Sequence, residues 1–315
     1  MIGISAIASY IPPGRESNLE KIERFGTDEA FIRDKIGVEA VSRKSASQQT
    51  SDLCVEAWKK LLEEKVIEPA QVDCAIVCTQ HPDGRGIPNV AAIVHGKLGL
   101  SESCAAFDIS LGCSGFVYSL SIIKSFMEAN LLRCGLLFTC DPYSPEISPD
   151  DKNTVLLFGD AATVTLLQEP EKNQLGWIPK NFIFGTRGCD GAALHNREGM
   201  MQMDGRAVFN FSATAVPAQI KTMLQKENLT LADIDLFLFH QGSKFILDTL
   251  QKRLGINAEK VPCNLASQGN TVSSSIPLLL ENYLSRTDLR RILLSGFGVG
   301  LSWASCLLEP HHPTN

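Results

Sequence analysis

The sequence predicts an α/β fold in which two similar halves form one layered body. Short apolar runs, such as Cys-Ala-Ile-Val-Cys at 74–78 and Leu-Phe-Leu-Phe at 236–239, are typical of strands that helices cover on both faces. Amphipathic helical patterns precede these runs. The same order of elements also occurs twice along the chain. We therefore expect helices sandwiched between two sheets.

The repeat can be followed without gaps. Residues 57–80 and 219–242, offset by 162 residues, each give an amphipathic helix, a polar turn, an aspartate and a buried strand. Residues 111–139 and 268–296 match at an offset of 157 and each give a glycine-flanked corner, a helix and a strand. Each half closes with an alternating strand. The predicted order in both halves is strand, helix, strand, helix, strand, strand.

The repeat also suggests where the chain divides. We expect an N-terminal half at residues 1–170 and a C-terminal half at residues 171–315. Segments 141–153 and 186–206 read as loops, and loops at strand ends often carry function.

The composition and charge argue against a nucleic-acid-binding protein and a membrane-spanning protein. With 315 residues and a net charge of −6, the chain offers no basic stripe for nucleic acid. No apolar run is long enough to span a membrane, and the N-terminus reads as a first strand, not a signal peptide. The ten cysteines form no Cys-x-x-Cys pair and mostly lie in apolar segments. This usage indicates reduced thiols and a cytoplasmic location.

Cys113 lies where an apolar run turns into a helical pattern. Gly112 and Gly115 flank it and leave room for another group to approach. A helix start offers unpaired backbone N–H groups and the positive end of the helix dipole, and both favour a thiolate nucleophile. Because a cysteine is more often a small buried hydrophobe, this interpretation depends on partners elsewhere in the chain.

The repeat supplies two candidate partners. Its second offset places Asn270 at the corner that corresponds to Cys113, and His240 ends a buried strand of the same half. Ligands gather at the carboxyl ends of such strands, so we expect Cys113, His240 and Asn270 to converge. The alternatives are a hydrogen-bonded core histidine and an asparagine that caps a helix.

Other polar motifs carry less information. Gly-Phe-Gly-Val-Gly at 296–300 follows a buried strand and can supply a backbone N–H to an oxyanion. It neither opens a helix nor precedes Gly-Lys-Ser/Thr, which argues against a phosphate loop. We expect Asp108 to brace the Cys113 corner. No spacing of histidine, cysteine and carboxylate predicts a metal site.

Several motifs together identify a family. The sequence resembles the thiolase-fold condensing enzymes, most closely β-ketoacyl-acyl-carrier-protein synthase III, along essentially its whole length. The fold implied is the thiolase-like αβαβα sandwich of two pseudo-symmetric halves. The motifs, in order, are FIRDKIGV (31–38), GCSGF (112–116), LLFGDAA (156–162), MDGRAVF (203–209), HQGS (240–243), GNTVSSSIP (269–277) and GFGVGLSWAS (296–305).

The resemblance implies a two-step condensation without metal or bound cofactor. Cys113 would take an acyl group from acyl-coenzyme A. His240 and Asn270 would then hold the thioester carbonyl of malonyl-acyl carrier protein, which brings its own phosphopantetheine, and stabilise the enolate formed on decarboxylation. The backbone N–H groups of Cys113 and Val299 would form the oxyanion hole. The product would be a β-ketoacyl-acyl carrier protein of fatty acid or secondary metabolite biosynthesis.

The resemblance also assigns substrate contacts and partners. Members of the family are homodimers that bind an acyl carrier protein. The residues implied are Phe31, Lys35 and Lys152 at the nucleotide end of coenzyme A; Phe158, Phe209 and Ser243 near the nucleophile and substrate arm; Ile87 towards the partner subunit's acyl pocket; and Lys244, Lys252 and Arg253 for carrier-protein docking.

Five positions depart from the family pattern. Ser243 replaces an asparagine after the histidine, and Val299 replaces the middle glycine of the oxyanion turn. Phe245 and Asn210 stand where many members carry basic docking residues. Position 31 is phenylalanine where tryptophan is common. These changes affect the acceptor and the acyl length more than acylation.

Enzymes of this fold with other activities differ from this sequence at particular positions. Gln80 stands where a hydroxymethylglutaryl-type synthase has glutamate, and no second cysteine lies in the C-terminal glycine turn as in a degradative thiolase. An acyltransferase of the same fold, passing the acyl group from Cys113 to an alcohol or amine with His240 as base, remains an alternative. A non-catalytic heterodimer partner is less favoured because all three chemical residues are present.

Overall fold

The computed structural model describes residues 1–170, 175–196 and 199–311. Within them a 9-stranded sheet has the order β11-β12-β13-β8-β1-β7-β6-β4-β5, and two 2-stranded sheets, β2–β3 and β9–β10, lie apart from it. The strands are β1 Gly3–Tyr10, β2 Gly14–Ser17, β3 Ala40–Arg43, β4 Cys74–Cys78, β5 Ala105–Ile109, β6 Cys134–Cys140, β7 Ala162–Gln168, β8 Trp177–Thr186, β9 Leu194–Asn196, β10 Met201–Met203, β11 Leu236–Phe239, β12 Ile292–Gly298 and β13 Ser302–Pro310. The α-helices are α1 Thr50–Glu64, α2 Val90–Leu98, α3 Gly115–Ala129, α4 Lys152–Val155, α5 Gly205–Lys226, α6 Lys244–Leu254 and α7 Ser275–Leu280.

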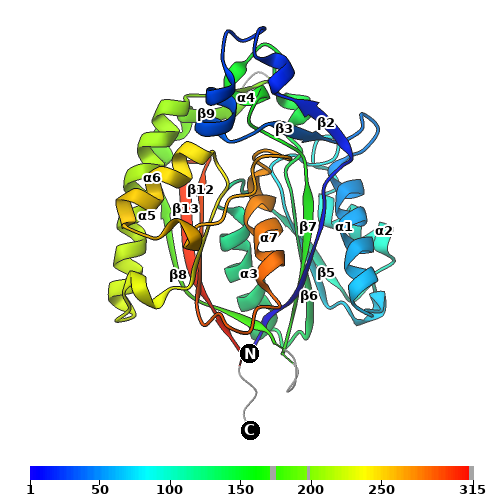
Figure 1. Ribbon diagram of the computed structural model, residues 1–315. Coiled ribbons are helices and arrows are strands. Elements are labelled where there is room, and N and C mark those ends of the chain that lie inside the picture. Colours follow the sequence, from blue (N-terminus) through cyan, green and yellow to red (C-terminus); the bar gives the residue numbers. More distant parts are fainter. Residues whose placement is uncertain (171–174, 197–198, 312–315) are drawn as a thin grey trace.

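The elements form five layers, as the αβαβα prediction requires (Figure 1). Helices α3 and α7 lie between two groups of strands, α1 and α2 cover one outer face, and α5 and α6 cover the other. The two groups of strands belong to one continuous sheet because β1 and β8 are neighbours, but they are joined there by a single residue pair, Ile4 and Trp177. The predicted fold class is confirmed.

The strand pairings repeat in the two halves. In the first, β4 runs parallel to β6, β6 antiparallel to β7, and β7 antiparallel to β1. In the second, β11 runs parallel to β12, β12 antiparallel to β13, and β13 antiparallel to β8. The predicted order of elements is confirmed for the repeated strands and helices, but it omits α2 and β5 in the first half and α6 in the second. The boundary expected between residues 170 and 171 stays a prediction, because residues 171–174 lie outside the described part of the chain.

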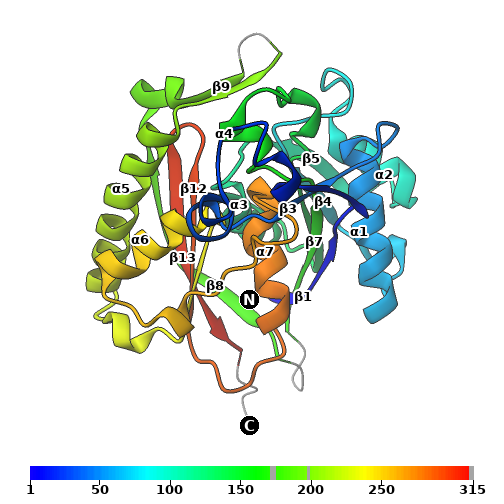
Figure 2. The same ribbon diagram turned by 45° about the horizontal axis from the view of Figure 1, so that its top comes forward.

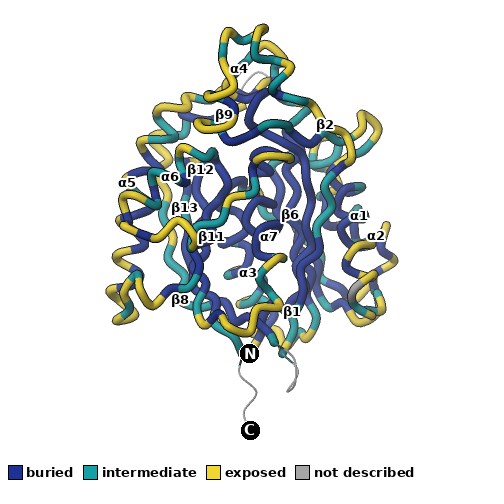
Figure 3. The backbone as a smooth tube through the Cα atoms, viewed as in Figure 1, coloured by how far each residue is buried: buried dark blue, intermediate teal, exposed yellow. Residues whose placement is uncertain are grey.

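Burial explains why the helices differ in sequence. Helix α3 is apolar on several sides, with Phe116, Val117, Leu120 and Ile123 fully buried between the two groups of strands. Helix α1 is amphipathic and exposes one face. Figure 3 shows the same contrast, with buried backbone through the central layer and exposed positions on the outer helices.

The structure differs from the sequence-based expectations in two places. Segment 186–206 is partly ordered into a 3₁₀ helix at Gly188–Ala193, the β9–β10 hairpin and the start of α5; residues 197 and 198 of this segment are outside the described range. The central helix of the second half is shorter than expected. Helix α7 ends at Leu280 and continues only as a 3₁₀ turn at Glu281–Tyr283, before the polar Ser-Arg-Thr-Asp stretch that precedes β12.

One end of the molecule gathers the connecting segments. Figure 2 brings forward the end where β2, β3, α4 and β9 lie over the central layer. A π-helical turn at Phe31–Ile36 packs there against α6. Because the carboxyl ends of β4, β6, β11 and β12 and the starts of α3 and α7 face this end, it is where a site is expected.

Candidate active site

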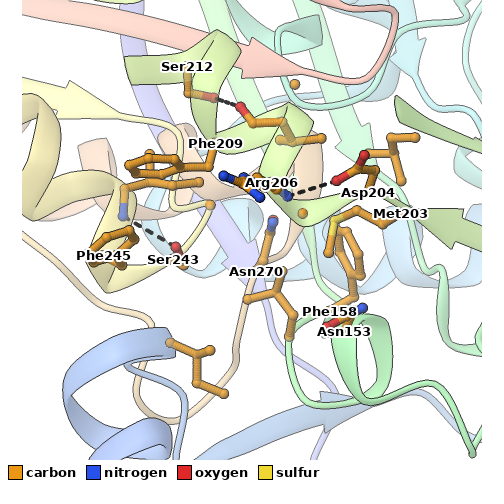
Figure 4. A pocket seen from close by; sticks show the side chains of 18 of the residues that line it. Asn153, Phe158, Met203, Asp204, Arg206, Phe209, Ser212, Ser243, Phe245 and Asn270 are labelled. Carbon is orange, nitrogen blue, oxygen red and sulfur yellow. Dashed lines mark hydrogen bonds between the residues drawn. The ribbon is translucent and has the colours of Figure 1, made fainter. Parts of the chain in front are cut away.

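A cavity of about 540 Å³ opens at this end and draws its walls from both halves. Its deeper part is formed by Cys113, His240, Asn270, Phe297 and Gly298. The other lining residues are Phe31, Lys35, Ile36, Lys152, Asn153, Leu156, Leu157, Phe158, Leu194, Met203, Asp204, Gly205, Arg206, Val208, Phe209, Ser212, Gly242, Ser243, Phe245 and Ile246. Figure 4 shows many of them from close by.

Cys113 lies in a tight turn directly before α3, where the Gly115 N–H donates to the Gly112 carbonyl over 2.7 Å. The residue is only 3% exposed. The glycine-rich end of β12 presses against it: a Cβ added at Gly298 would lie 2.6 Å from Cys113 Cβ and 2.7 Å from Sγ. The glycines therefore permit two backbone segments from opposite halves to meet at the sulfur.

The thiol is not activated in the way the sequence suggested. Burial raises the pKa of Cys113 to about 12, although backbone hydrogen bonds from Val299 and from Cys113 itself pull in the opposite direction. Desolvation of the thiolate outweighs the helix-start effect because the sulfur is fully enclosed. The predicted preference for thiolate is therefore wrong, and the thiol needs a base.

The same hydrogen bonds locate two backbone donors. The contributions that lower the Cys113 pKa come from the backbone of Val299 and of Cys113 itself, which therefore lie near the sulfur. They are the two groups expected from the sequence to form an oxyanion hole. An oxygen on a carbon bonded to Sγ would lie within their reach.

His240 ends β11, as predicted, and its backbone N–H donates to the Ser295 carbonyl over 2.9 Å. Its ring meets the Phe297 ring edge-on, with centroids 5.6 Å apart, and its Nδ1 lies 2.8 Å from Ser275 Oγ. Burial lowers the pKa of His240 to about 3, opposed only by a hydrogen bond with the Val272 backbone. The imidazole is therefore neutral at physiological pH, and can accept a proton.

Asn270 is 3% exposed and is held at both side chain and backbone. Its Oδ1 accepts the Val272 N–H over 2.9 Å and so caps a local turn, but Asn270 is not the helix cap of the alternative interpretation, because Thr271 and Ser274 precede the 3₁₀ turn at Val272–Ser274 and α7. The amide group remains directed into the cavity, where Figure 4 shows it. Its backbone N–H donates to the Leu157 carbonyl over 2.8 Å, and its carbonyl accepts the Gly159 N–H over 2.9 Å. The cap orients Asn270 and leaves its Nδ2 as a donor.

The cavity mouth is aromatic and cationic. Lys35 and Lys152 place their ammonium groups 5.5 and 5.2 Å from the centre of the Phe31 ring. On the other rim Phe209 stacks on Phe245, with centroids 4.8 Å apart and an interplanar angle of 25° (Figure 4).

Two more predicted residues lie within the cavity wall. Ser243 caps α6, because its Oγ accepts the Ile246 N–H over 3.3 Å. Phe158 is buried beside Asn270, to which it is linked by an isolated parallel bridge.

Other predicted residues lie outside the cavity. Ile87 is 92% exposed on the loop before α2. Lys244, at the start of α6, forms a 2.7 Å ion pair with Asp248. Lys252 and Arg253 lie in the last turn of α6.

The expectation that Asp108 braces the Cys113 corner is wrong. Its carboxylate instead accepts the Val90 and Ala91 N–H groups over 2.8 and 2.7 Å, which fastens the start of α2. The aspartate lies on β5, and its side chain is satisfied by the neighbouring helix start.

Sequence reasoning missed several wall residues. Arg206 lies at the first turn of α5, and Asp204 caps that helix by accepting the Arg206 and Ala207 N–H groups, each over 3.0 Å. An Asp-Gly-Arg stretch before a helical pattern is a capping signal that was available. Ser275, the neighbour of His240, carried no signal beyond a run of serines.

Among residues 1–170, 175–196 and 199–311, no group of three or more histidine, cysteine, aspartate or glutamate side chains is placed to hold a metal ion. In the same residues no helix is both long and apolar enough to cross a membrane.

Two protein-family models and a related protein match this chain. The family model of 3-oxoacyl-[acyl-carrier-protein (ACP)] synthase III matches residues 107–185, and that of its C-terminal part matches residues 224–309. The β-ketoacyl-[acyl-carrier-protein] synthase III of Streptococcus suis is 31% identical over 97% of this chain and 98% of its own.

Solved structures agree. The crystal structure of a 3-oxoacyl-(acyl-carrier protein) synthase from Burkholderia xenovorans matches with a TM-score of 0.89 and 32% identity, covering 100% of this chain and 95% of that one. The priming β-ketosynthase from the R1128 polyketide biosynthetic pathway matches with a TM-score of 0.86 and 25% identity, covering 99% and 97%.

Fold and cavity thus define a condensing enzyme with the thiolase-like architecture. Within that class, the chain belongs to the β-ketoacyl-[acyl-carrier-protein] synthase III family.

Proposed function

We propose that this protein joins an acyl group from acyl-coenzyme A to malonyl-acyl carrier protein, with loss of CO₂, to give a β-ketoacyl-acyl carrier protein. The observation that carries the proposal is the convergence of Cys113, His240 and Asn270 at the bottom of one cavity. The backbone of Val299 and of Cys113, which lies near the sulfur, supplements them. Acyl-coenzyme A is a substrate, and the reaction needs no separate cofactor.

In the first half-reaction, Cys113 is the nucleophile. Its proton passes to neutral His240, the sulfur attacks the thioester carbonyl, and the N–H groups of Cys113 and Val299 stabilise the oxyanion. The bond to the coenzyme A sulfur then breaks, and that sulfur leaves as a thiol with the proton from His240. Cys113 retains the acyl group as a thioester.

In the second half-reaction, His240 and Asn270 bind the carbonyl oxygen of the malonyl thioester. The bond to the carboxylate carbon breaks, CO₂ leaves, and the electron pair becomes an enolate whose oxygen these two donors stabilise. The enolate carbon attacks the acyl group on Cys113. The carbon–sulfur bond to Cys113 breaks, and the released thiolate takes a proton from solvent water.

The aromatic and cationic side chains at the cavity mouth suit a substrate arm that carries negative charge and an aromatic base. We assign Phe31, Lys35 and Lys152 to the nucleotide end of coenzyme A, because a ring flanked by two cations can meet both a base and phosphates. Phe158, Phe209 and Ser243 would contact the substrate arm. On α6, the side chains that would dock the acidic carrier protein are Lys244, Lys252 and Arg253. The ion pair with Asp248 partly offsets the positive charge of Lys244.

We also propose that the protein is a cytoplasmic homodimer built from halves that meet near residue 170. Strand β5 ends the sheet, and all five of its residues are partly exposed, so its edge is available to a second copy. Exposed apolar side chains at Ile87 and Phe184 support a further contact. The ten cysteines are all free thiols, which suits a reducing compartment.

The experiment is intact-protein mass spectrometry after incubation with acetyl-, butyryl-, hexanoyl- and octanoyl-coenzyme A. We expect one acyl adduct on the wild type and none on Cys113→Ala, with the Cys189→Ala variant, which removes an exposed thiol, behaving as wild type. Malonyl-acyl carrier protein should discharge the adduct with release of CO₂. Absence of an adduct with every donor would overturn the proposal, and discharge only to an alcohol or amine would favour the acyltransferase alternative.

A further inference from the structure

Arg43, the last residue of β3, fastens the segment that follows helix α4, in the region that Figure 2 brings forward. Its Nη1 donates to the Phe158 carbonyl over 2.6 Å, and its Nη2 donates to the Val155 carbonyl over 3.3 Å. Both acceptor residues are buried. One guanidinium therefore connects the last residue of α4 with the third residue beyond it, a span that its planar fork of donors suits.

The segment that Arg43 holds is also the segment to which Asn270 is bound. The Asn270 N–H donates to the Leu157 carbonyl over 2.8 Å, and the Gly159 N–H donates to the Asn270 carbonyl over 2.9 Å. The Phe158 carbonyl lies between these two groups in sequence and accepts from the guanidinium instead. The segment is therefore held by Arg43 and Asn270 together, and a movement of the segment would move the asparagine.

A carboxylate orients the Arg43 side chain. Its Nε lies 3.2 Å from Glu16 Oε1, and Lys21 Nζ lies 2.7 Å from Glu16 Oε2. Glu16 belongs to β2, which pairs with β3. The Arg43 side chain is 13% exposed, so its charge is largely withdrawn from water and depends on these partners. Removing the guanidinium would leave two buried carbonyls without their donor.

The backbone of Asn270 decides where its amide nitrogen lies. Its Oδ1 accepts the Val272 N–H over 2.9 Å, which fixes the amide relative to its own main chain. A catalytic group displaced by about 1 Å can lose about a hundredfold in rate. In the proposed reaction Asn270 binds the enolate oxygen and takes no part in acylation of Cys113. Displacement of its backbone therefore bears on one half-reaction.

We propose that Arg43, oriented by Glu16, is a positioning residue for the condensation step, because it holds the backbone segment to which Asn270 is bound. This inference rests on the proposed function, in which the Asn270 amide stabilises the enolate. Arg43 lies outside the cavity lining and acts through residues 157–159.

The test measures the two half-reactions separately in Arg43→Ala. With saturating acetyl-coenzyme A, the rate of acyl transfer to Cys113 should change by no more than about threefold. For release of CO₂ from malonyl-acyl carrier protein by the acylated enzyme, kcat should fall by about tenfold or more, with a smaller change in KM. Saturating donor is used because α4 also carries Lys152, which we assign to coenzyme A.

Arg43→Lys is the conservative variant. It keeps a positive charge for Glu16 and fills much of the space, but a single nitrogen replaces the fork of donors. It should show a smaller loss in the same condensation step. This variant also gives a result if Arg43→Ala does not fold.

A second group of arginine, glutamate and lysine provides the matched control. Arg291 Nε lies 2.8 Å from Glu309 Oε1, and Lys180 Nζ lies 2.9 Å from Glu309 Oε2. This group lies at the start of β12, whereas the cavity lies at its end. Arg291→Ala should therefore leave the ratio of the two rates unchanged.

Two results would overturn the inference and leave the condensing function intact. One is an unchanged ratio of the two rates in both Arg43 variants, and the other is an equal loss in both half-reactions. Wild-type protein that accepts an acyl group from no donor would instead count against the proposed function itself.

Discussion

The two halves of the molecule each bring one side chain to the start of a central helix, but they hold it by different means. Cys113 is enclosed by backbone that comes close because Gly296 and Gly298 lack side chains. Asn270 is enclosed by hydrogen bonds, with its backbone bound to Leu157 and Gly159. In both corners the contacts come from the opposite half. Neither corner is complete without the other half of the chain.

The three serines that lie close after Asn270 in the sequence add further hydrogen bonds to the second corner. Ser273 Oγ donates to the Asp141 carboxylate, Ser274 Oγ donates to the Thr139 carbonyl over 2.9 Å, and Ser275 Oγ lies 2.8 Å from His240 Nδ1. All three are buried. The Cys113 corner is thus set by close packing, which shapes space around the sulfur. The Asn270 corner is set by a polar network, which orients donors.

The largest effect is expected from filling the space at the first corner. In Gly298→Ala the new methyl group would collide with Cys113 Cβ and Sγ, so both half-reactions should fall by about a hundredfold or more. Acylation followed by mass spectrometry and CO₂ release measure the two steps. Gly96→Ala is the control, since nothing lies within 4 Å of its added Cβ. Near-normal acylation in Gly298→Ala would show that close packing does not set this corner.

The second corner should separate the two half-reactions. Asn270→Asp keeps an oxygen for the Val272 N–H and replaces the amide donor, so condensation should fall by about a hundredfold. Acylation of Cys113 should change by only a few-fold and serves as the internal control. Equal losses in both steps would mean that Asn270 supports the architecture and not the enolate.

The carboxylate that connects the corners should give the fold a pH dependence. Burial raises the pKa of Asp141 from 3.8 to about 6, while hydrogen bonds from Ser273 and Gln80 oppose the shift. A carboxyl group with a raised pKa binds its proton more tightly in the folded protein. Its contribution to stability is therefore present at low pH and is lost as the pH rises from about 4 to about 6.

Asp141→Asn tests that sign. We expect the free energy of unfolding of the wild type, measured relative to the variant by urea titration, to decrease by about 2 to 3 kcal/mol between pH 4 and pH 6.5. Taking the difference removes the contributions of the other carboxylates. A constant difference across this range would contradict the assignment.

The smallest effect concerns the orientation of His240. Ser275→Ala removes the hydroxyl beside Nδ1, which also accepts the Gln241 N–H over 3.3 Å, so condensation should slow by about tenfold. Ser275→Thr retains the hydroxyl and should recover most of the rate, whereas Ser103→Ala at an exposed position should have no effect. Equal rates in Ser275→Ala and wild type would remove this positioning role.

Much of the fold could be predicted because the repeat shows directly in the sequence. Buried strands such as 74–78 and 236–239 were placed at their observed bounds, since continuous apolar runs depend little on distant contacts. The offset of 157 residues in the sequence pairs Cys113 with Asn270. The shortness of α7 was missed, because a local pattern does not show where a helix gives way to a turn.

Electrostatic properties were the least predictable. The helix start suggested a thiolate at Cys113, but enclosure by β12 reverses the direction of the pKa shift. Enclosure is a tertiary property that no local motif reports.

The bridge between Phe158 and Asn270 has a dynamic consequence. Where β1 meets β8, the two groups of strands share one residue pair, Ile4 and Trp177. At the cavity the two halves are held by backbone bonds that include those of Asn270 to Leu157 and Gly159. Any opening between the halves must break the hydrogen bond of the Asn270 amide. Its hydrogen should therefore exchange with solvent as slowly as those of the core strands, which makes this residue a natural reporter of how tightly the two halves stay closed.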